Sequence, residues 1–334
     1  MLDSTREGRV AVTVMRGLPV PVCVGAISLL TILAAYAADN DAGPLSIRRE
    51  LRAEAAPRAD IRVDSNLVLV PVSVTDFRNR LVTGLQAGEF RVFEGKTEQK
   101  VLQLSSEDAP LSVGIVFDSS GSMSDKLPNA RQAVAEFLHT ANPGDEFFLV
   151  RFSGKAELAV PFTRSQGEIQ NRLVFANSAG KTALLDAICL ALHYLRNAAN
   201  ERKALLVISD GGENASRYGK SEIRQMLEES DVWLYALGIC PTRFRAFPEE
   251  ELAGPRLLTE IAEETGGREI PVHQARELPA AAAEIGFELR NRYVLAYRPE
   301  DAACDGKYHR VQVRLVGHRF THLSFRSGYY APAR

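Results

Sequence analysis

Oxygen-bearing side chains recur at three places where the sequence passes from an apolar run or a loop into a helix. Asp118, Ser120 and Ser122 stand two positions apart, directly after the apolar run 111–117. Thr182 precedes a helical pattern, and Asp210 follows a further apolar run. Carboxylate and hydroxyl oxygens are hard ligands that suit Mg²⁺, or Mn²⁺ or Ca²⁺, rather than a soft metal. The five side chains therefore predict a divalent-cation site with one coordination position left open.

The segments that must position these residues alternate between strand and helix patterns. Buried strands are predicted from the apolar runs 111–117, 147–152, 204–209 and 232–239. Helices are predicted at 126–140, 183–197, 221–229, 256–264 and 280–290. This alternation with short connections predicts an α/β fold, a doubly wound, Rossmann-like parallel sheet over residues 109–290. Ligands bind such sheets at the carboxyl ends of the strands, which is where the five oxygen donors lie.

The stretches on either side, residues 60–108 and 291–334, carry strand patterns alone. Each has too few strands for a core of its own. We therefore expect the flanking antiparallel β segments to pair into one small sandwich-like unit, with the α/β domain inserted between them. In the first stretch Pro71 predicts an edge strand, and Phe90–Phe93 with Lys100–Leu104 predicts a hairpin around Glu94-Gly95-Lys96.

The N-terminus has the layout of a secretory signal peptide over residues 1–37. Arginines precede the apolar stretch 20–37, which ends in the small-x-small site Ala35-Tyr36-Ala37. An uncleaved anchor helix is the alternative, because about 18 apolar residues is near the spanning minimum. Residues 38–59 are predicted to be an exposed linker. The protein is thus expected to be periplasmic or extracellular, and at a membrane only if the segment stays uncleaved. An intact N-terminus on the mature protein, by mass spectrometry, would contradict cleavage.

Charge and cysteine content exclude some functions. The net charge is −2 with no basic stripe, which argues against nucleic acid as a partner. Three cysteines lie outside the apolar N-terminal segment, namely Cys189, Cys240 and Cys304, and none forms a C-x-x-C pair. They are interpreted first as small buried apolar residues, with a Cys240–Cys304 disulfide as the second alternative. No zinc site follows from them.

At its oxygen donors the sequence resembles the von Willebrand factor type A (integrin inserted-domain-like) family over about residues 109–290. The resemblance rests on Asp118-x-Ser120-x-Ser122, on Thr182 in Gly180-Lys181-Thr182-Ala183-Leu184, and on Asp210 in Ile208-Ser209-Asp210-Gly211. It implies that these five residues form a metal-ion-dependent adhesion site. The flanks resemble a bacterial subfamily of secreted proteins related to that domain, seen especially in acidobacteria. The matching runs are Val72–Asp76, Leu85 to Phe93-Glu94-Gly95, Asn291-x-Tyr293-x-Leu295 and Gly328-Tyr329-Tyr330.

The resemblance and the charge count together predict a binding function. If a water holds Asp210 off the metal, the ion keeps a net positive charge and takes a carboxylate from outside, an Asp or Glu of a partner protein. The resemblance also implies that the first loop could switch the metal between contact with Thr182 and contact with Asp210. The leading interpretation is an exported, cation-dependent protein-binding or cell-adhesion module.

Two alternatives belong to other classes: a metal-dependent hydrolase, and a structural envelope component with a stabilising metal. The sequence has no Asp-x-Asp arrangement at Asp118 and no Gly-x-Ser-x-Gly. We therefore predict no enzyme and assign no catalytic residue.

Simpler interpretations apply to several neighbours of these residues. Asp-x-Ser-x-Ser alone often marks a helix cap, and Ser124 and Asp125 are expected to cap the helix that begins near Lys126. Asp186 either supports the site from behind or holds its helix in place. The six histidines are expected to be structural or surface residues.

Overall fold

The computed structural model describes residues 67–106, 109–239, 249–299, 305–318 and 321–331. The predictions for the signal peptide or anchor, for the linker and for a Cys240–Cys304 disulfide fall outside these residues. Of the cysteines, Cys189 is described, and it is a buried free thiol. Within the described ranges no helix has the length and apolar character needed to cross a membrane.

A six-stranded sheet carries the oxygen donors. Its strand order is β10-β9-β8-β5-β6-β7. The strands are β5 (Leu111–Asp118), β6 (Glu146–Phe152), β7 (Ala156–Thr163), β8 (Arg202–Ser209), β9 (Val232–Ile239) and β10 (Glu269–Val272). The chain runs from β5 to β6 on one side and returns to β8 on the other, so the order reverses between β5 and β8. This confirms the predicted doubly wound fold and puts its switch point between these two strands.

One edge of this sheet differs from the prediction. β7 pairs antiparallel with β6, whereas the sequence reading predicted parallel strands and no strand at 156–163. Only the turn Ser153–Lys155 separates the two strands, and the Ser153 N–H donates to the Lys155 carbonyl at 3.1 Å. A parallel connection needs a crossover of a dozen residues or more, so this turn forces the antiparallel pairing.

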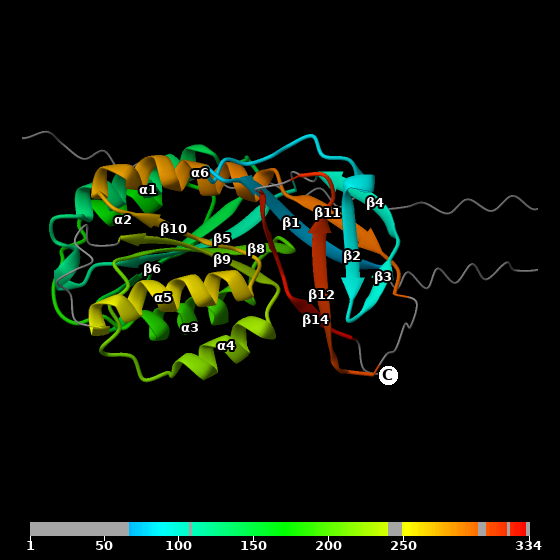
Figure 1. The fold of residues 1–334 in the computed structure, drawn as a ribbon. Coiled ribbons are helices and arrows are strands. Elements are labelled where there is room, and N and C mark those ends of the chain that lie inside the picture. Colours follow the sequence, from blue (N-terminus) through cyan, green and yellow to red (C-terminus); the bar gives the residue numbers. More distant parts are fainter. Residues whose placement is uncertain (1–66, 107–108, 240–248, 300–304, 319–320, 332–334) are drawn as a thin grey trace, which may run out of the picture. The chain divides into compact units, whose positions relative to one another are not determined.

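Helices cover both faces of the sheet (Figure 1). One face carries α1 (Leu127–His139), α2 (Gln166–Val174) and α6 (Leu278–Arg290). The other carries α3 (Leu184–Leu195), α4 (Lys220–Glu228) and α5 (Glu249–Glu264). Three short 3₁₀ turns complete the helical elements, namely η1 (Ala87–Glu89), η2 (Gly121–Met123) and η3 (Ala275–Glu277). The predicted helices lie close to their observed bounds, except that α5 begins at Glu249 rather than Arg256. Neither α2 nor β10 was predicted.

The central strand β5 fixes the edge where the oxygen donors lie. All eight of its residues are buried. Ile115 and Phe117 pack with α1, α2 and α6, while Val116 packs with α3 and α5 on the opposite face. Each large apolar side chain buried in this way contributes about 1.5–3 kcal/mol. Apolar packing on both faces therefore holds the carboxyl end of β5 in place.

The two flanks pair with each other, as predicted. One four-stranded sheet has the order β13-β1-β11-β4 and the other the order β14-β12-β2-β3. The N-terminal flank supplies β1 (Val68–Asp76), β2 (Phe90–Glu94), β3 (Thr97–Gln99) and β4 (Val101–Ser106). The C-terminal flank supplies β11 (Tyr293–Tyr297), β12 (Tyr308–Leu315), β13 (Thr321–Phe325) and β14 (Gly328–Tyr330). Figure 1 shows blue and cyan strands interleaved with orange and red ones.

Two local expectations in the flanks were wrong. Pro71 lies in β1, which is an interior strand rather than an edge strand. The pairing of β1 with β13 begins only at Val72, so the proline sits where one neighbouring strand is missing and needs no ladder hydrogen bond on that side. The hairpin partner of β2 is β3 rather than Lys100–Leu104. The latter segment lies mostly in β4, which pairs with β11 in the other sheet.

Residues 62–334 form one structural unit, and Arg292 connects the inserted α/β part to the paired flanks. Its side chain is fully buried and donates to the Gly266 carbonyl at 2.5 Å and to the Ser324 carbonyl of β13 at 3.3 Å. The guanidinium lies 4.5 Å from the ring centre of Trp233 in β9. This cation–π contact compensates part of the loss of water around the charge.

Candidate functional site

The five predicted oxygen donors lie on three turns at one end of the six-stranded sheet. Asp118 is the last residue of β5, and Asp210 directly follows β8, the neighbouring strand across the switch point. Ser120 and Ser122 belong to the turn after β5, where Gly121–Met123 forms η2. Thr182 stands just before α3. We call these the first turn (118–124), the second turn (176–183) and the third turn (209–219).

Backbone hydrogen bonds fix the first turn against the second. The Ala179 N–H donates to the Ser119 carbonyl at 3.0 Å, and the Gly121 N–H donates to the Gly180 carbonyl at 3.1 Å. Gly180 has a φ of 81°, a left-handed conformation that glycine adopts without steric cost. The spacing between the serines and Thr182 is therefore set by main-chain contacts.

The third turn is fixed against the second in the same way. The Thr182 N–H donates to Asn214 Oδ1 at 2.9 Å, and the Asn214 and Ala215 N–H groups donate to the Thr182 carbonyl at 3.0 and 3.1 Å. A Cβ atom at Gly212 would lie 3.3 Å from Thr182 Oγ1, so a side chain there would crowd the threonine hydroxyl. Backbone and amide contacts thus hold Thr182 beside the residues that follow Asp210.

Asp118 is a fully buried carboxylate with two neutral hydrogen-bond donors. Its oxygens accept the Ser120 N–H at 2.8 Å and the Ser209 hydroxyl at 2.5 Å. Burial raises the pKa of Asp118 to about 6, an effect that these hydrogen bonds partly offset and the charge of Asp210 increases. A carboxylate this buried is more stable with a positive group beside it.

The other predicted metal ligands lie close to one another or to the ammonium group of a lysine. Ser120 Oγ lies 3.2 Å from Ser122 Oγ. Asp210 is nearly buried, and its Oδ2 accepts a hydrogen bond from Lys126 Nζ at 2.6 Å. Ser120 and Thr182 are themselves almost fully buried, whereas Ser122 is exposed. The arrangement thus combines two carboxylates, three hydroxyls and one ammonium group.

Some neighbouring residues have roles that differ from the expectation. Ser124 and Asp125 do not cap α1, because the N-cap residue is Lys126 and the helix has no side-chain cap. Asp186 fits neither alternative alone, since its carboxylate accepts the Arg217 and Tyr218 N–H groups and thereby joins α3 to the third turn.

Three contributors were not assigned a role from the sequence, namely Lys126, Ser209 and Asn214. Ser209 had a detectable signal, as the one polar residue between an apolar strand and Asp210. Lys126 and Asn214 had none, because their partners lie 84 and 32 positions away along the chain.

Comparison with known families agrees with this geometry. Residues 113–213 match the family model of the von Willebrand factor type A domain. The chain contains a von Willebrand factor type A domain. The matched residues include the first and second turns, Asp210, the strand β8 and all but the first two residues of β5.

Individual relatives are distant. An uncharacterized protein of Borreliella burgdorferi is 23% identical over 193 residues, which are 51% of this chain. The chain spans 55% of the length of that curated relative. An aerotolerance-related membrane protein of Bacteroides fragilis is 21% identical with a TM-score of 0.44, over 54% of this chain and 98% of that one. A von Willebrand factor type A structure from Catenulispora acidiphila is 12% identical with a TM-score of 0.48, over 80% and 73%.

In the von Willebrand factor type A domain, the spacing of the two serine oxygens is compatible with a small divalent cation. Ligands 2.0–2.1 Å from Mg²⁺ in an octahedron stand about 3 Å from their neighbours, and the two serine oxygens are 3.2 Å apart. Among the described residues no group of three or more His, Cys, Asp or Glu is arranged to hold a metal. The five side chains at the three turns offer hydroxyl and carboxylate oxygens, which are hard ligands of the kind that suit Mg²⁺ better than a soft metal.

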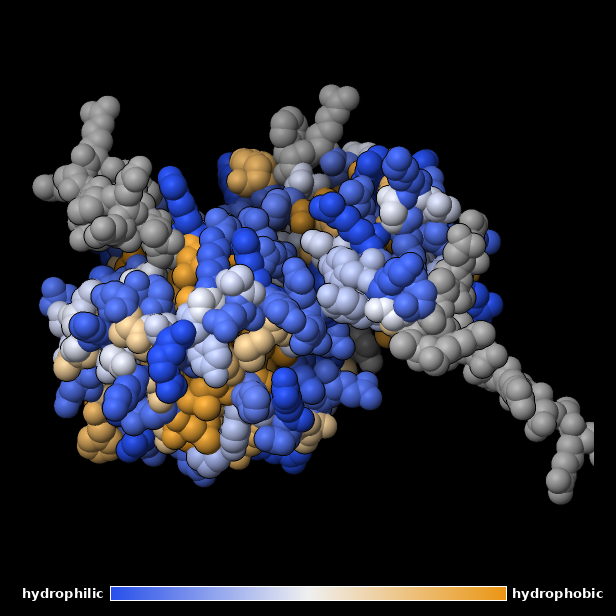
Figure 2. All heavy atoms as spheres, turned by 90° about the horizontal axis from the view of Figure 1, so that it is seen from below, coloured by the Kyte–Doolittle hydropathy of each residue, from blue (hydrophilic) through white to orange (hydrophobic). Residues whose placement is uncertain are grey.

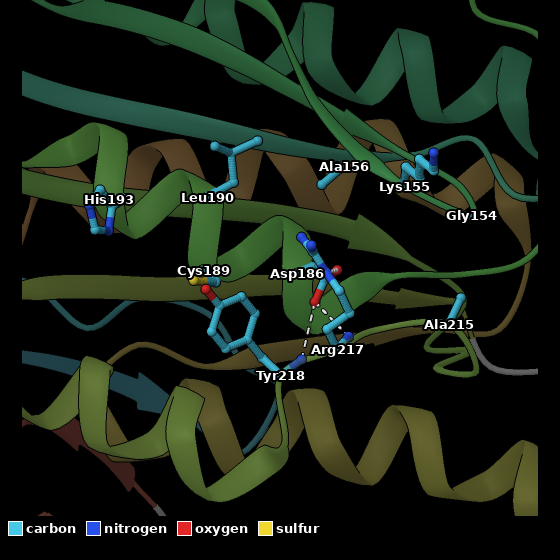
Figure 3. A pocket seen from close by; sticks show the side chains of 10 residues that line it. All are labelled: Gly154, Lys155, Ala156, Asp186, Cys189, Leu190, His193, Ala215, Arg217 and Tyr218. Atoms are coloured by element: carbon cyan, nitrogen blue, oxygen red, sulfur yellow. Dashed lines mark hydrogen bonds and ion pairs between the residues drawn. The ribbon is translucent and has the colours of Figure 1, made fainter.

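A pocket of about 650 Å³ lies beside the second and third turns (Figure 3). Four residues of α3 between Asp186 and His193 line it, together with Gly154, Lys155 and Ala156 and with the end of the third turn. The Tyr218 hydroxyl lies beside the Cys189 thiol at the wall of the pocket. Figure 2 views the face of α3, α4 and α5, where hydrophobic residues are exposed between hydrophilic ones.

Proposed function

We propose that this chain is an exported protein whose von Willebrand factor type A domain binds an acidic residue of a partner protein through a divalent cation, Mg²⁺, or Mn²⁺ or Ca²⁺. The domain is a protein-interaction fold. The observation that carries the finer proposal is the convergence of Asp118, Ser120 and Thr182, three almost fully buried polar side chains, on turns locked together by main-chain hydrogen bonds. The buried Asp118 carboxylate has only neutral hydrogen-bond donors beside it, and a bound cation would offset the cost of burying its charge.

The charge of the donors supports an acidic partner. A bound divalent cation would supply a positive centre that attracts a carboxylate. Asp118 contributes one negative charge and Asp210 is already paired with Lys126 Nζ, whereas Ser120, Ser122 and Thr182 contribute none. The three turns lie at the strand ends of the switch point, where a doubly wound sheet is open to ligands. Recognition of an Asp or Glu side chain therefore follows from the donor set.

The proposal of binding rather than catalysis rests on the same donors. The residues at the turns offer hydroxyls and carboxylates for holding an ion, and we assign none of them a role as nucleophile or general base. Export rests on the apolar segment 20–37 and its small-x-small site.

Asp118→Ala tests this function in the full chain, with Asp125→Ala as a matched control that removes an exposed carboxylate of the same loop. Asp118→Ala should lower Mn²⁺ affinity more than about a hundredfold by calorimetric titration, and chelator-sensitive crosslinking of envelope proteins should be lost. The variant should stay folded, because the raised pKa means that the ionised carboxylate is unfavourable in the folded chain without a cation. Equal Mn²⁺ binding by both variants, or equally strong crosslinking in EDTA, would refute the proposal.

A further inference from the structure

The ion pair between Lys126 and Asp210 connects the start of α1 to the third turn. Lys126 Nζ lies 2.6 Å from Asp210 Oδ2, between residues 84 positions apart in the chain. The lysine side chain is 27% exposed and the aspartate side chain 9%. The pair is thus shielded from water on the aspartate side, and it brings an ammonium group to one of the two carboxylates among the five oxygen donors.

The position of Lys126 is unfavourable for its own helix. It is the N-cap residue of α1, and the first turn of that helix has no acidic residue. A positive charge at a helix N-terminus opposes the helix dipole, which favours anions there by about 0.3–1 kcal/mol. N-cap positions also favour Ser, Thr, Asp or Asn. Helix stability therefore does not explain this lysine, whereas the contact with Asp210 gives it a partner.

The two carboxylates at the turns are neutralised differently. The hydrogen-bond donors to Asp118 are the Ser120 N–H and the Ser209 hydroxyl, which are neutral. Asp210 instead receives a full positive charge from Lys126. Two free carboxylates would balance a divalent ion completely. With one of them already balanced by an ammonium group, a single negative charge remains to face the ion.

We propose that Lys126 is an internal counter-ion that competes with the divalent cation for Asp210 and thereby makes the site select an acidic partner. This inference rests on the proposed function. Lys126 weakens the hold of the turns on the metal, and it leaves on the metal a positive charge that only an external carboxylate removes. Lys126 thus weakens the binding of the cation and strengthens the binding of the partner's carboxylate.

Calorimetric titration of Mn²⁺ into the full chain tests this, in chloride and in acetate buffers of equal ionic strength, with acetate as the carboxylate probe. Lys126→Met keeps the length and the apolar stem of the side chain and removes the charge. It should bind Mn²⁺ about tenfold more tightly in chloride, because Asp210 becomes available. In wild-type protein, acetate should tighten Mn²⁺ binding by reciprocal linkage. Lys126→Met should lose this effect of acetate.

Two further variants separate this effect from general electrostatics. Lys155→Met removes an exposed positive charge beside the second turn and should leave both quantities within about twofold of wild type. Lys126→Arg keeps the positive charge and should resemble wild type. If wild type binds Mn²⁺ and Lys126→Met shows the same affinity and the same acetate effect, the inference is overturned and the proposed function is left intact. Absence of Mn²⁺ binding in every variant, wild type included, would overturn both.

Discussion

At the scale of single residues, Asp118 and Thr182 are both buried oxygen donors, yet they differ in what they offer a cation. Asp118 is fully buried and carries a charge that its neutral neighbours do not balance. Thr182 offers a neutral hydroxyl, and main-chain hydrogen bonds fix its position. Charge count dominates the affinity of oxygen ligands for hard cations. The two residues should therefore contribute unequally.

Thr182→Ala should weaken Mn²⁺ binding by about tenfold, which is less than the loss expected for Asp118→Ala. Removing the hydroxyl takes away a ligand but no charge, and the hydrogen bonds of the Thr182 backbone remain. Thr182→Ser is the control, because it keeps the hydroxyl and should stay near wild type. Calorimetric titrations that rank Thr182→Ala below Asp118→Ala in affinity would contradict this assignment of roles.

The position of the five oxygen-bearing side chains at one end of the sheet was predictable from the sequence, but the groups that hold them there were not. Asp118 and Asp210 follow apolar runs of strand length, and parallel strands end at a common edge, so their convergence follows from the fold. Ser209 and Lys126 act through partners 91 and 84 positions away. Such pairings depend on side-chain placement in space, which neither periodicity nor spacing encodes.

At the scale of elements, Glu213 binds the third turn to the start of α3. Its Oε2 accepts the Leu185 N–H at 2.9 Å, and its Oε1 accepts the Ser216 N–H at 2.9 Å. The carboxylate also lies at the N-terminus of a helix, where negative charge is favourable. Because Thr182 directly precedes α3, this residue helps to fix Thr182 relative to Asp210.

Glu213→Gln should lower the free energy of unfolding by about 1–2 kcal/mol and weaken Mn²⁺ binding several-fold. An amide offers one acceptor in place of two, so it must release either the third turn or α3. Glu222→Gln is a matched control, since Glu222 accepts the Gly219 N–H at the start of α4 without joining two of the three turns. It should change stability alone. Unaltered Mn²⁺ affinity in Glu213→Gln would show that this link does not position the site.

The strands and helices around the site were predictable to the extent that burial makes them apolar. β5 and β9 are buried almost throughout and lie close to their predicted bounds. β7 was missed because it is a partly exposed edge strand that contains Pro161. The edge prediction from Pro71 was wrong for the strand as a whole, because β1 lacks a second neighbour only as far as this residue. The pairing with β13 begins at Val72, one position further along.

At the scale of the whole molecule, the two flanks meet at a cluster of ionisable groups around His309 of β12. His309 Nδ1 lies 2.6 Å from Glu94 Oε1 at the end of β2, and Nε2 lies 3.1 Å from Asp305 Oδ1. Glu94 also accepts the Tyr297 hydroxyl of β11 at 2.8 Å. The cluster thus joins one strand of the N-terminal flank to two strands of the C-terminal flank.

The charge of His309 should make this junction depend on pH. Its hydrogen bonds to Glu94 first, and to Asp305 next, raise the pKa of His309 above the ordinary value of 6.5. Lys307, Tyr297 and Tyr329 are the other ionisable groups around the cluster. A raised histidine pKa in the folded chain means that the stabilisation is complete below about pH 6.5 and is lost as the pH rises through the higher folded value.

His309→Gln therefore destabilises the protein most at about pH 6 and least at alkaline pH, where wild-type histidine is neutral as well. The expected difference is about 1 kcal/mol of unfolding free energy at pH 6, or about 2–4 °C in Tm, and it should shrink by pH 9. His193→Gln, at an exposed position of α3, should show no such trend. Thermal unfolding across this pH range checks it. A difference between wild type and His309→Gln that stays constant or grows above neutrality would mean that the pairing of the flanks does not draw on the charge of His309.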